Sequence, residues 1–175
     1  KKLVEDFFDN DGFPLSRNIY DLVQCSKFLI LIRECCKEAQ EYIPDYLEDI
    51  VEKIILCVNS IKTPNNNSPL FNGASEFKIN DFYNYLAGLD YKLITKKRTI
   101  GQICILNSKK VSLFFDIGSP PKKKYSGSYQ SGPLSFEYYN DEDKIVTNCG
   151  YGSKISKKIE QISRLTSAQS SLTLN

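Results

Sequence analysis

The chemistry open to this 175-residue chain is limited first by the absence of histidine. Histidine is the side chain that most often exchanges protons near neutral pH, so Ser-His-Asp and Cys-His nucleophile systems cannot be built from this chain alone. A zinc site would have to use only cysteines and carboxylates. Any catalysis would therefore depend on Tyr, Lys, Asp, Glu or Cys.

Two short segments carry side chains that can bind or deprotonate an acidic ligand. Arg17 and Asn18 can hold a carboxylate, Arg17 through a bidentate pair, but they also suit the start of a helix. Tyr20 is a weak candidate for a catalytic base, and the alternative is a tyrosine at a helix interface. Asn72, followed by Gly73, can place a polar group at a domain junction or form a plain turn.

The balance of charge argues against two classes of partner. The formal net charge is +2, which indicates neither a nucleic-acid-binding protein nor a membrane-surface protein. The longest apolar run, residues 28–32, is too short to span a membrane. The basic segments 96–98 and 122–124 can attract a polyanion, and the alternative is solvated loop charge.

The sequence predicts no metal and no cofactor. Residues 141–143 are acidic, but without further ligands at a suitable spacing they are typical of a hairpin tip, and Asp116 has no identifiable partner. The six cysteines show no C-x-x-C spacing and fall mainly in apolar helix or strand patterns, which favours buried thiols in a reducing compartment. The chain starts within an apolar pattern and without Met, and we interpret it as a piece of a longer protein.

The apolar residues follow a helical period up to about residue 90. Ser16 is predicted to cap a helix that ends before Pro44, and Pro44 suits the first turn of a second helix. The second helix carries apolar residues at the i, i+3, i+4, i+7 spacing over 47–61. We expect these helices to form an antiparallel hairpin, followed by a turn-rich loop over 63–69 and a short helix over 80–89.

Beyond Tyr91 the pattern changes to that of short strands. Residues 99–106 and 111–117 flank one predicted hairpin turn, residues 134–139 and 144–148 flank another, and residues 170–174 are predicted as a final strand. Short antiparallel strands of this kind favour a sandwich. The sequence therefore predicts an α+β chain made of two parts that join near residue 90.

Five motifs in this order resemble a known family. They are DGFPLSRN (11–18), LFNG (70–73), GPLSFE (132–137), VTNCG (146–150) and RLTSAQSSLTL (164–174). Together, over residues 9–174, they resemble the heparinase II/III-like polysaccharide lyases, in their proteobacterial branch.

The resemblance implies both a fold and a chemistry. The family joins an α/α toroid of helical hairpins to an antiparallel β-sandwich. We therefore expect residues 1–90 to be the C-terminal helices of a toroid and residues 91–175 to be the N-terminal part of a sandwich. The implied reaction is β-elimination on acidic polysaccharides such as glycosaminoglycans, in which tyrosine and histidine transfer protons and asparagine or glutamate neutralises the uronate carboxylate. A metal bound by histidine and aspartate supports the sandwich in some members.

This chain departs from the family pattern wherever a histidine is expected. Pro14 stands at one histidine position, and Asp21-Leu22 stands where active lyases often have Tyr-His, with Tyr20 one position away. Gln130 and Gln169 align with two further histidines. A glutamine can form hydrogen bonds, but it cannot exchange a proton near neutral pH and is a poor zinc ligand.

These departures predict a substrate groove without proton-transfer groups. The expected groove-lining residues are Arg17, Asn18, Asn72, Gln130 and Gln169. We predict a truncated, histidine-free family member with little or no lyase activity.

Two alternatives stay open beside that prediction. The chain can be a non-catalytic module that binds acidic glycans, or a split or decayed gene product that needs a companion chain to complete its toroid and sandwich. The compartment also stays open, since the resemblance implies a periplasmic or secreted protein while the unpaired cysteines favour the cytoplasm.

Overall fold

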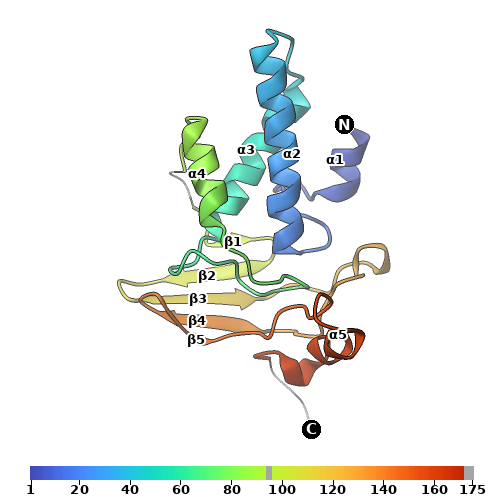
Figure 1. The fold of residues 1–175 in the computed structure, drawn as a ribbon, viewed down its shortest axis with the longest axis vertical. Helices are drawn as coiled ribbons and strands as arrows, with labels where there is room; N and C mark the ends of the chain where they lie inside the picture. Colours follow the sequence, from blue (N-terminus) through green and yellow to red (C-terminus); the bar gives the residue numbers. More distant parts are fainter. Residues whose placement is uncertain (94–95, 172–175) are drawn as a thin grey trace.

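The computed structural model describes residues 1–93 and 96–171. In Figure 1 the helices α2, α3 and α4 rise from the β1 side of an antiparallel sheet, and α5 lies beside the opposite, β5 side. The described helices are α1 (Lys2–Phe7), α2 (Ile19–Glu38), α3 (Asp45–Ser60), α4 (Asn80–Gly88) and α5 (Lys157–Ser163), with 3-10 turns at Lys123–Tyr125 and Thr166–Ala168. The strands are β1 (Thr99–Ile100), β2 (Ile103–Asn107), β3 (Val111–Asp116), β4 (Phe136–Asn140) and β5 (Asp143–Val146).

Helices α2 and α3 form the antiparallel hairpin that the apolar spacing predicts (Figure 1). The predicted cap was wrong: Asn18, not Ser16, caps α2, because its Oδ1 accepts a hydrogen bond from the Tyr20 amide at 2.9 Å. The Ser16 hydroxyl instead donates to the Asp21 carboxylate at 2.7 Å. Pro44 occupies the N-cap position of α3, one residue before the first turn.

The strands form one antiparallel meander in the order β1-β2-β3-β4-β5. The strand predicted over 99–106 is interrupted by Gly101 and Gln102, which have φ angles of 54° and 61°. Two successive positive φ angles are typical of a tight hairpin turn, and they fold β1 back onto β2. Both predicted hairpins are confirmed, with Asn107 opposite Ser112 and Asn140 opposite Asp143.

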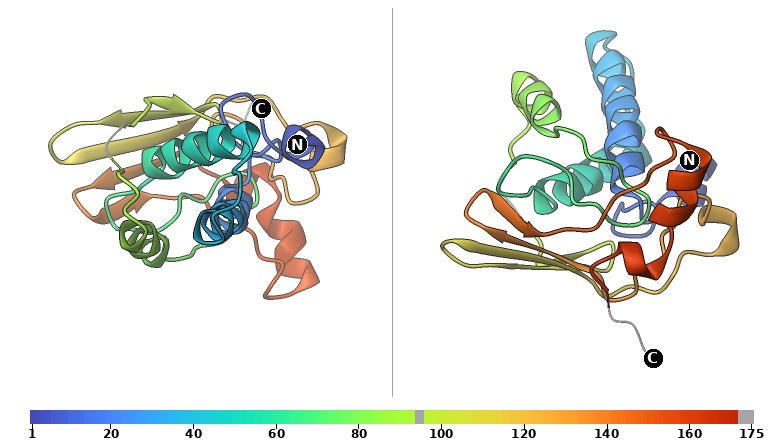
Figure 2. Two further views of the ribbon diagram at one scale, coloured as in Figure 1. Left: turned by 90° about the horizontal axis from the view of Figure 1, so that it is seen from above. Right: turned by 60° about the horizontal axis from the view of Figure 1, so that its bottom comes forward.

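One face of the sheet is buried beneath the segment that links α3 to α4. Phe114, Glu137 and Tyr139 point to this face and are at most 1% exposed. The linking segment crosses it, and the Leu70 amide donates to the Glu137 carboxylate at 3.1 Å (Figures 1 and 2). A single apolar cluster includes residues from α2, α3, α4 and the sheet, so the helices and the sheet share one core.

The opposite face of the sheet carries partly exposed apolar side chains. Leu106 is 51% exposed, and Cys104, Leu113, Phe115 and Tyr138 on the same face are partly exposed. Within the described residues there is a single five-stranded sheet, which is one of the two layers that a sandwich requires.

Some predicted and observed elements differ at the ends of the chain. Of the final strand predicted over 170–174, residues 172–174 lie outside the described residues. Helices α1 and α5 were not among the elements predicted from the sequence; α5 begins where the Ser156 hydroxyl accepts the Ile159 amide at 3.2 Å. In the described segments no helix is long and apolar enough to cross a membrane.

Candidate functional site at the junction of helices and sheet

A buried ion pair joins the start of α2 to the end of β3. Arg17 precedes the α2 cap with a φ of 58°, a left-handed conformation that is uncommon for a residue with a side chain. Its guanidinium pairs with the Asp116 carboxylate, and both side chains are at most 7% exposed. The remaining guanidinium donors reach the Gly101 and Ser119 carbonyl oxygens at 3.3 and 3.1 Å. Arg17 thus has its donors engaged inside the protein.

Asn72 and Gly73 form a turn that packs into the same junction. The side-chain Nδ2 of Asn72 donates to the second carboxylate oxygen of Asp116 at 3.2 Å. Gly73 has a φ of 90°, and a side chain there would collide with the backbone and side chain of Ser128. Asn18 also reaches Ser128, because its Nδ2 donates to the Ser128 hydroxyl at 3.2 Å.

Gln130 joins this turn to the C-terminal segment. It is 2% exposed. Its Oε1 accepts the Gly73 amide at 3.1 Å, and its Nε2 donates to the carbonyl oxygens of Gly150 and Ser163, the latter at 3.0 Å. The side chain is therefore hydrogen-bonded at both ends.

Gln169 reaches the same acceptor from the other side. Its Nε2 donates to the Ser163 carbonyl oxygen at 2.7 Å and lies 3.6 Å from the Cys149 sulfur. Burial raises the pKa of the Cys149 thiol, which disfavours the reactive thiolate.

Tyr20 lies outside this network, on the first turn of α2. Its ring is 38% exposed, meets the Phe77 ring edge-on at 5.5 Å between centroids, and lies 5.7 Å from the Lys154 ammonium nitrogen. The residue at the expected catalytic tyrosine position is Asp21, whose carboxylate accepts the Ser16 hydroxyl. Tyr20 is thus an exposed aromatic residue beside a cation.

A cavity of about 570 Å³ opens next to the junction. Pro14 and Arg17 line it, together with Lys122, Lys124 and Tyr125 from the loop after β3. The structure thus brings Arg17 and two lysines of the basic segment, Lys122 and Lys124, to one cavity, although about a hundred residues separate them in the sequence. Glu5 and Asp9 line its other wall, so its electrostatic character is mixed.

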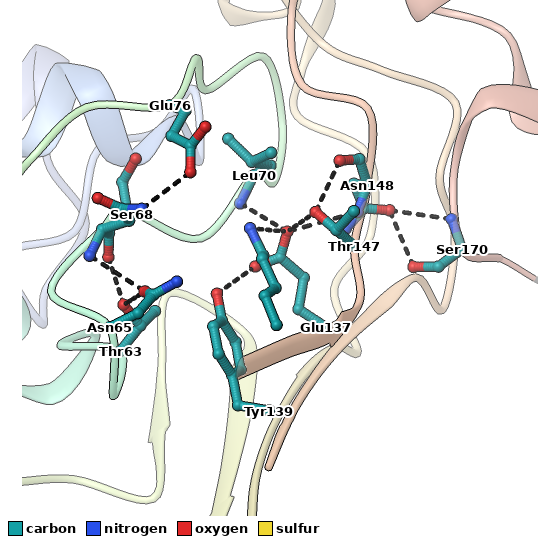
Figure 3. Close-up of polar contacts among 12 residues, drawn as sticks. Thr63, Asn65, Ser68, Leu70, Glu76, Glu137, Tyr139, Thr147, Asn148 and Ser170 are labelled. Atoms are coloured by element: carbon teal, nitrogen blue, oxygen red, sulfur yellow. Dashed lines mark hydrogen bonds and ion pairs between the residues drawn. The ribbon is translucent and has the colours of Figure 1, made fainter. Parts of the chain in front are cut away.

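A second buried network, centred on Glu137, has no role in the sequence-based prediction. Glu137 is fully buried; its carboxylate accepts the Leu70 amide and the Thr147 hydroxyl, and it lies 3.1 Å from the Lys144 ammonium (Figure 3). The Tyr139 hydroxyl donates to its second oxygen at 2.9 Å. A carboxylate at an inward-facing position of an apolar strand is the sequence signal that could have pointed to it.

Two tyrosines, one in the junction and one in the Glu137 network, have raised pKa values. Tyr129, next to Gln130, is half-buried, and its pKa is raised by burial and by the Asp116 charge. Burial, followed by the charge of Glu137 and the hydrogen bond to it, raises the pKa of Tyr139. A raised pKa makes a tyrosine a poorer base near neutral pH.

The residues present do not fit the metal site that the family resemblance implies. The side-chain Nε2 atoms of Gln130 and Gln169 both donate N–H groups to the Ser163 carbonyl oxygen, so they cannot bind a metal ion. The side-chain oxygen of Gln130 already accepts the backbone N–H of Gly73. In the described part of the chain, no group of three or more His, Cys, Asp or Glu residues could hold a metal ion.

Residues 98–175 match the family model described as "Heparinase II/III-like, C-terminal". The family resemblance and the α+β class predicted from the sequence are confirmed.

Solved structures resemble almost the whole chain. The crystal structure of the heparan sulfate lyase HepC from Pedobacter heparinus matches with a TM-score of 0.77 at 16% identity, covering 99% of this chain and 31% of that chain. A heparinase III gene product matches at 0.79 and 14% identity with the same coverage. A further heparinase III structure matches at 0.74 and 12% identity, covering 96% of this chain and 33% of that one.

These structural matches show the fold, and the chain spans about a third of the length of the structures that it matches. No curated protein matched the sequence.

Proposed function

We propose that this chain is a polysaccharide-lyase scaffold of the heparinase II/III type with little or no turnover. Its descent would have suited it to β-elimination on acidic glycans. In this proposal residues 1–90 are the C-terminal helices of a toroid, and residues 91–175 are the N-terminal part of a sandwich. The observation that carries it is the junction itself, where the amides of Asn72, Gln130 and Gln169 are engaged in internal hydrogen bonds.

The chemistry of the reaction explains why these residues are insufficient. β-Elimination needs a base that removes the proton next to a uronate carboxylate and a group that stabilises the resulting enolate. A carboxamide cannot act as the base that removes this proton. The Arg17 cation, which could pair with the uronate carboxylate, is already neutralised by Asp116. Of the sequence-predicted candidates, only Tyr20 carries an ionisable hydroxyl.

The proposal is tested by incubating the purified chain with heparan sulfate, alginate and hyaluronan and recording the ultraviolet absorbance of unsaturated uronate. We expect no sustained product growth. A Tyr20→Phe variant serves as the matched control, because a trace signal that it leaves unchanged does not arise from Tyr20. Sustained growth that is lost in Tyr20→Phe would contradict the proposal.

A non-catalytic role in binding acidic glycans is the second candidate. It is supported by Lys122 and Lys124, two lysines that line the cavity next to the junction. Replacing both lysines with serine should weaken the binding of heparan sulfate, and the binding should fall with added salt. The control is Lys109→Ser with Lys110→Ser, two exposed lysines in the β2–β3 turn that do not line this cavity. Equal loss in both double variants would indicate unspecific charge attraction and contradict a specific site.

A third candidate is a piece that needs a companion chain. Two apolar surfaces support it: the outer face of the sheet around Leu106, and a wholly apolar groove between α1 and α2 lined by Leu3, Val4, Phe7, Phe8, Cys25, Phe28 and Leu29. Exposed apolar patches and strand edges favour association. The isolated chain should therefore self-associate, as measured by light scattering. Monomeric behaviour with a cooperative unfolding transition would count against this candidate.

A further inference from the structure

The carbonyl oxygen of Ser163 is a meeting point of three separate segments. Ser163 ends α5 and is buried, and its carbonyl accepts both the Gln130 and the Gln169 carboxamide N–H groups, at 3.0 and 2.7 Å. The Ser163 hydroxyl also accepts the Gly152 amide at 3.1 Å and donates to the Glu160 carbonyl at 2.8 Å. The C-terminal segment is thus folded around this one residue.

Gln130 extends the connection to the helical part of the chain. Its oxygen accepts the amide of Gly73, in the segment between α3 and α4, while its nitrogen donates to Gly150 and Ser163 in the C-terminal segment. Only a side chain with a donor and an acceptor at its two ends can satisfy all three partners at once. A carboxylate would lack the donor, and its charge would be left facing two carbonyl oxygens.

We propose that Gln130 and Gln169 form a metal-independent clasp that fastens the C-terminal segment, residues 149–170, to the Asn72–Gly73 turn. The two glutamines occupy positions where the family resemblance implies histidines and, in some members, a supporting metal. Here two carboxamides meet at one backbone carbonyl and hold the same segments by hydrogen bonds alone. The clasp is independent of whether the chain has any lyase turnover, since it concerns only contacts within the chain.

The test converts each carboxamide to a carboxylate, because this change has opposite effects on a clasp and on a metal site. Gln130→Glu and Gln169→Glu remove the N–H donors, which breaks the clasp, but they supply better metal ligands. Gln161→Glu is the matched control, since Gln161 is exposed and lies in α5, the helix that ends at Ser163. Thermal unfolding of the 175-residue chain and its variants is recorded with EDTA, and with Zn²⁺ or Ca²⁺ added.

We expect the unfolding midpoint of the wild-type chain to be the same in EDTA and in added metal. Gln130→Glu and Gln169→Glu should lower the midpoint by about 4–8 °C, because each replaces an N–H donor to the Ser163 carbonyl oxygen with a negatively charged carboxylate that faces it. Added metal should not restore it, and Gln161→Glu should leave it unchanged. Gln169 is only partly buried, so its variant keeps the test usable if Gln130→Glu does not fold.

Two results would overturn the proposal. One is a fall of the wild-type midpoint on chelation or a rescue of the Glu variants by metal, which would show a metal site. The other is an unfolding midpoint of Gln130→Glu and Gln169→Glu that equals that of Gln161→Glu, which would show that these hydrogen bonds do not stabilise the fold.

Hydrogen exchange adds an independent readout of the connection to the helical part. Gln130→Met removes the acceptor of the Gly73 amide and should speed the exchange of that amide about tenfold, whereas Gln169→Glu should not. Unchanged exchange at Gly73 in Gln130→Met would separate Gln130 from this turn and refute its place in the clasp.

Discussion

Arg17 forms a buried ion pair with Asp116 in the structure, although it was predicted to bind a ligand. An arginine beside an asparagine is a reasonable carboxylate site in a sequence, yet here the carboxylate is supplied by the end of β3. Once two such charges are buried as a pair, the loss of either partner leaves the other unpaired. A substitution of Arg17 therefore tests whether this residue stabilises the fold.

Replacing Arg17 with alanine should destabilise the chain by about 3 kcal/mol, because the Asp116 charge would remain buried without its partner. Urea unfolding measures the change. Lys97→Ala is the matched control: Lys97 pairs with Asp11 at 2.8 Å, but on the surface, so its loss should cost under about 1 kcal/mol. Equal effects for the two variants would contradict the buried-pair interpretation.

Gly73 carries the second prediction about a single position. With a φ of 90° and Ser128 packed against its Cα, Gly73→Ala should cost at least about 2 kcal/mol in the free energy of unfolding. Gly88→Ala is its control, because Gly88 lies in α4 with open space around it and alanine favours a helix. A tolerated Gly73→Ala would show that the turn can move away from Ser128.

The secondary-structure elements were predictable where one face repeats an apolar pattern. The α2–α3 hairpin and both later hairpins follow from spacing and turn residues alone. The Ser16 cap was wrong because Ser16 and Asn18 are both good capping residues, and local sequence does not decide which one the chain uses. Helix α5 was not predicted from the sequence; it is only seven residues long, and its apolar residues Ile159 and Ile162 are exposed.

An acid-sensitive cluster ties α2 to the segment that follows α4. Burial acts to raise the pKa of Glu34, but hydrogen bonds from Tyr91 and Arg33 prevail and hold this pKa below its ordinary value of 4.5. The carboxylate form is therefore favoured by folding. The stability that this provides is present above pH 4.5 and is lost as the pH falls through the lowered pKa.

Glu34→Gln should consequently unfold with a weaker dependence on pH below about 4.5 than the wild-type chain. Urea titrations at several pH values measure this slope. Glu38→Gln is the control, since Glu38 ends the same helix and is exposed. Parallel slopes for the wild type and Glu34→Gln would show that the cluster does not couple folding to pH.

At the scale of the whole molecule, the features that could not be predicted from the sequence are contacts between residues far apart in the chain. The motifs indicated the family resemblance, but the partners of Gln130 at Gly73 and Ser163 lie 57 and 33 residues away in the sequence. Spacing rules do not reach such distances. The structure brings Arg17, Asn18, Asn72, Gln130 and Gln169 to one junction, and their roles as groove-lining residues stay a prediction.

The apolar outer face of the sheet should govern how the isolated chain behaves in solution. Leu106→Lys with Ile117→Lys should reduce aggregation and the binding of a hydrophobic dye, because both side chains are about half exposed. Tyr42→Lys is the control, since Tyr42 is 74% exposed in the α2–α3 turn, away from the sheet. The same reduction in Tyr42→Lys would point to a general charge effect.

The central claim is that a lyase scaffold persists here without groups that can shuttle protons. It is tested most directly with the chain in molar excess over heparan sulfate, where even one slow turnover per molecule becomes visible as unsaturated uronate. The account predicts a flat absorbance trace over hours, identical in wild type and Tyr20→Phe. A rise in the wild type that is proportional to protein concentration and abolished in Tyr20→Phe would contradict it.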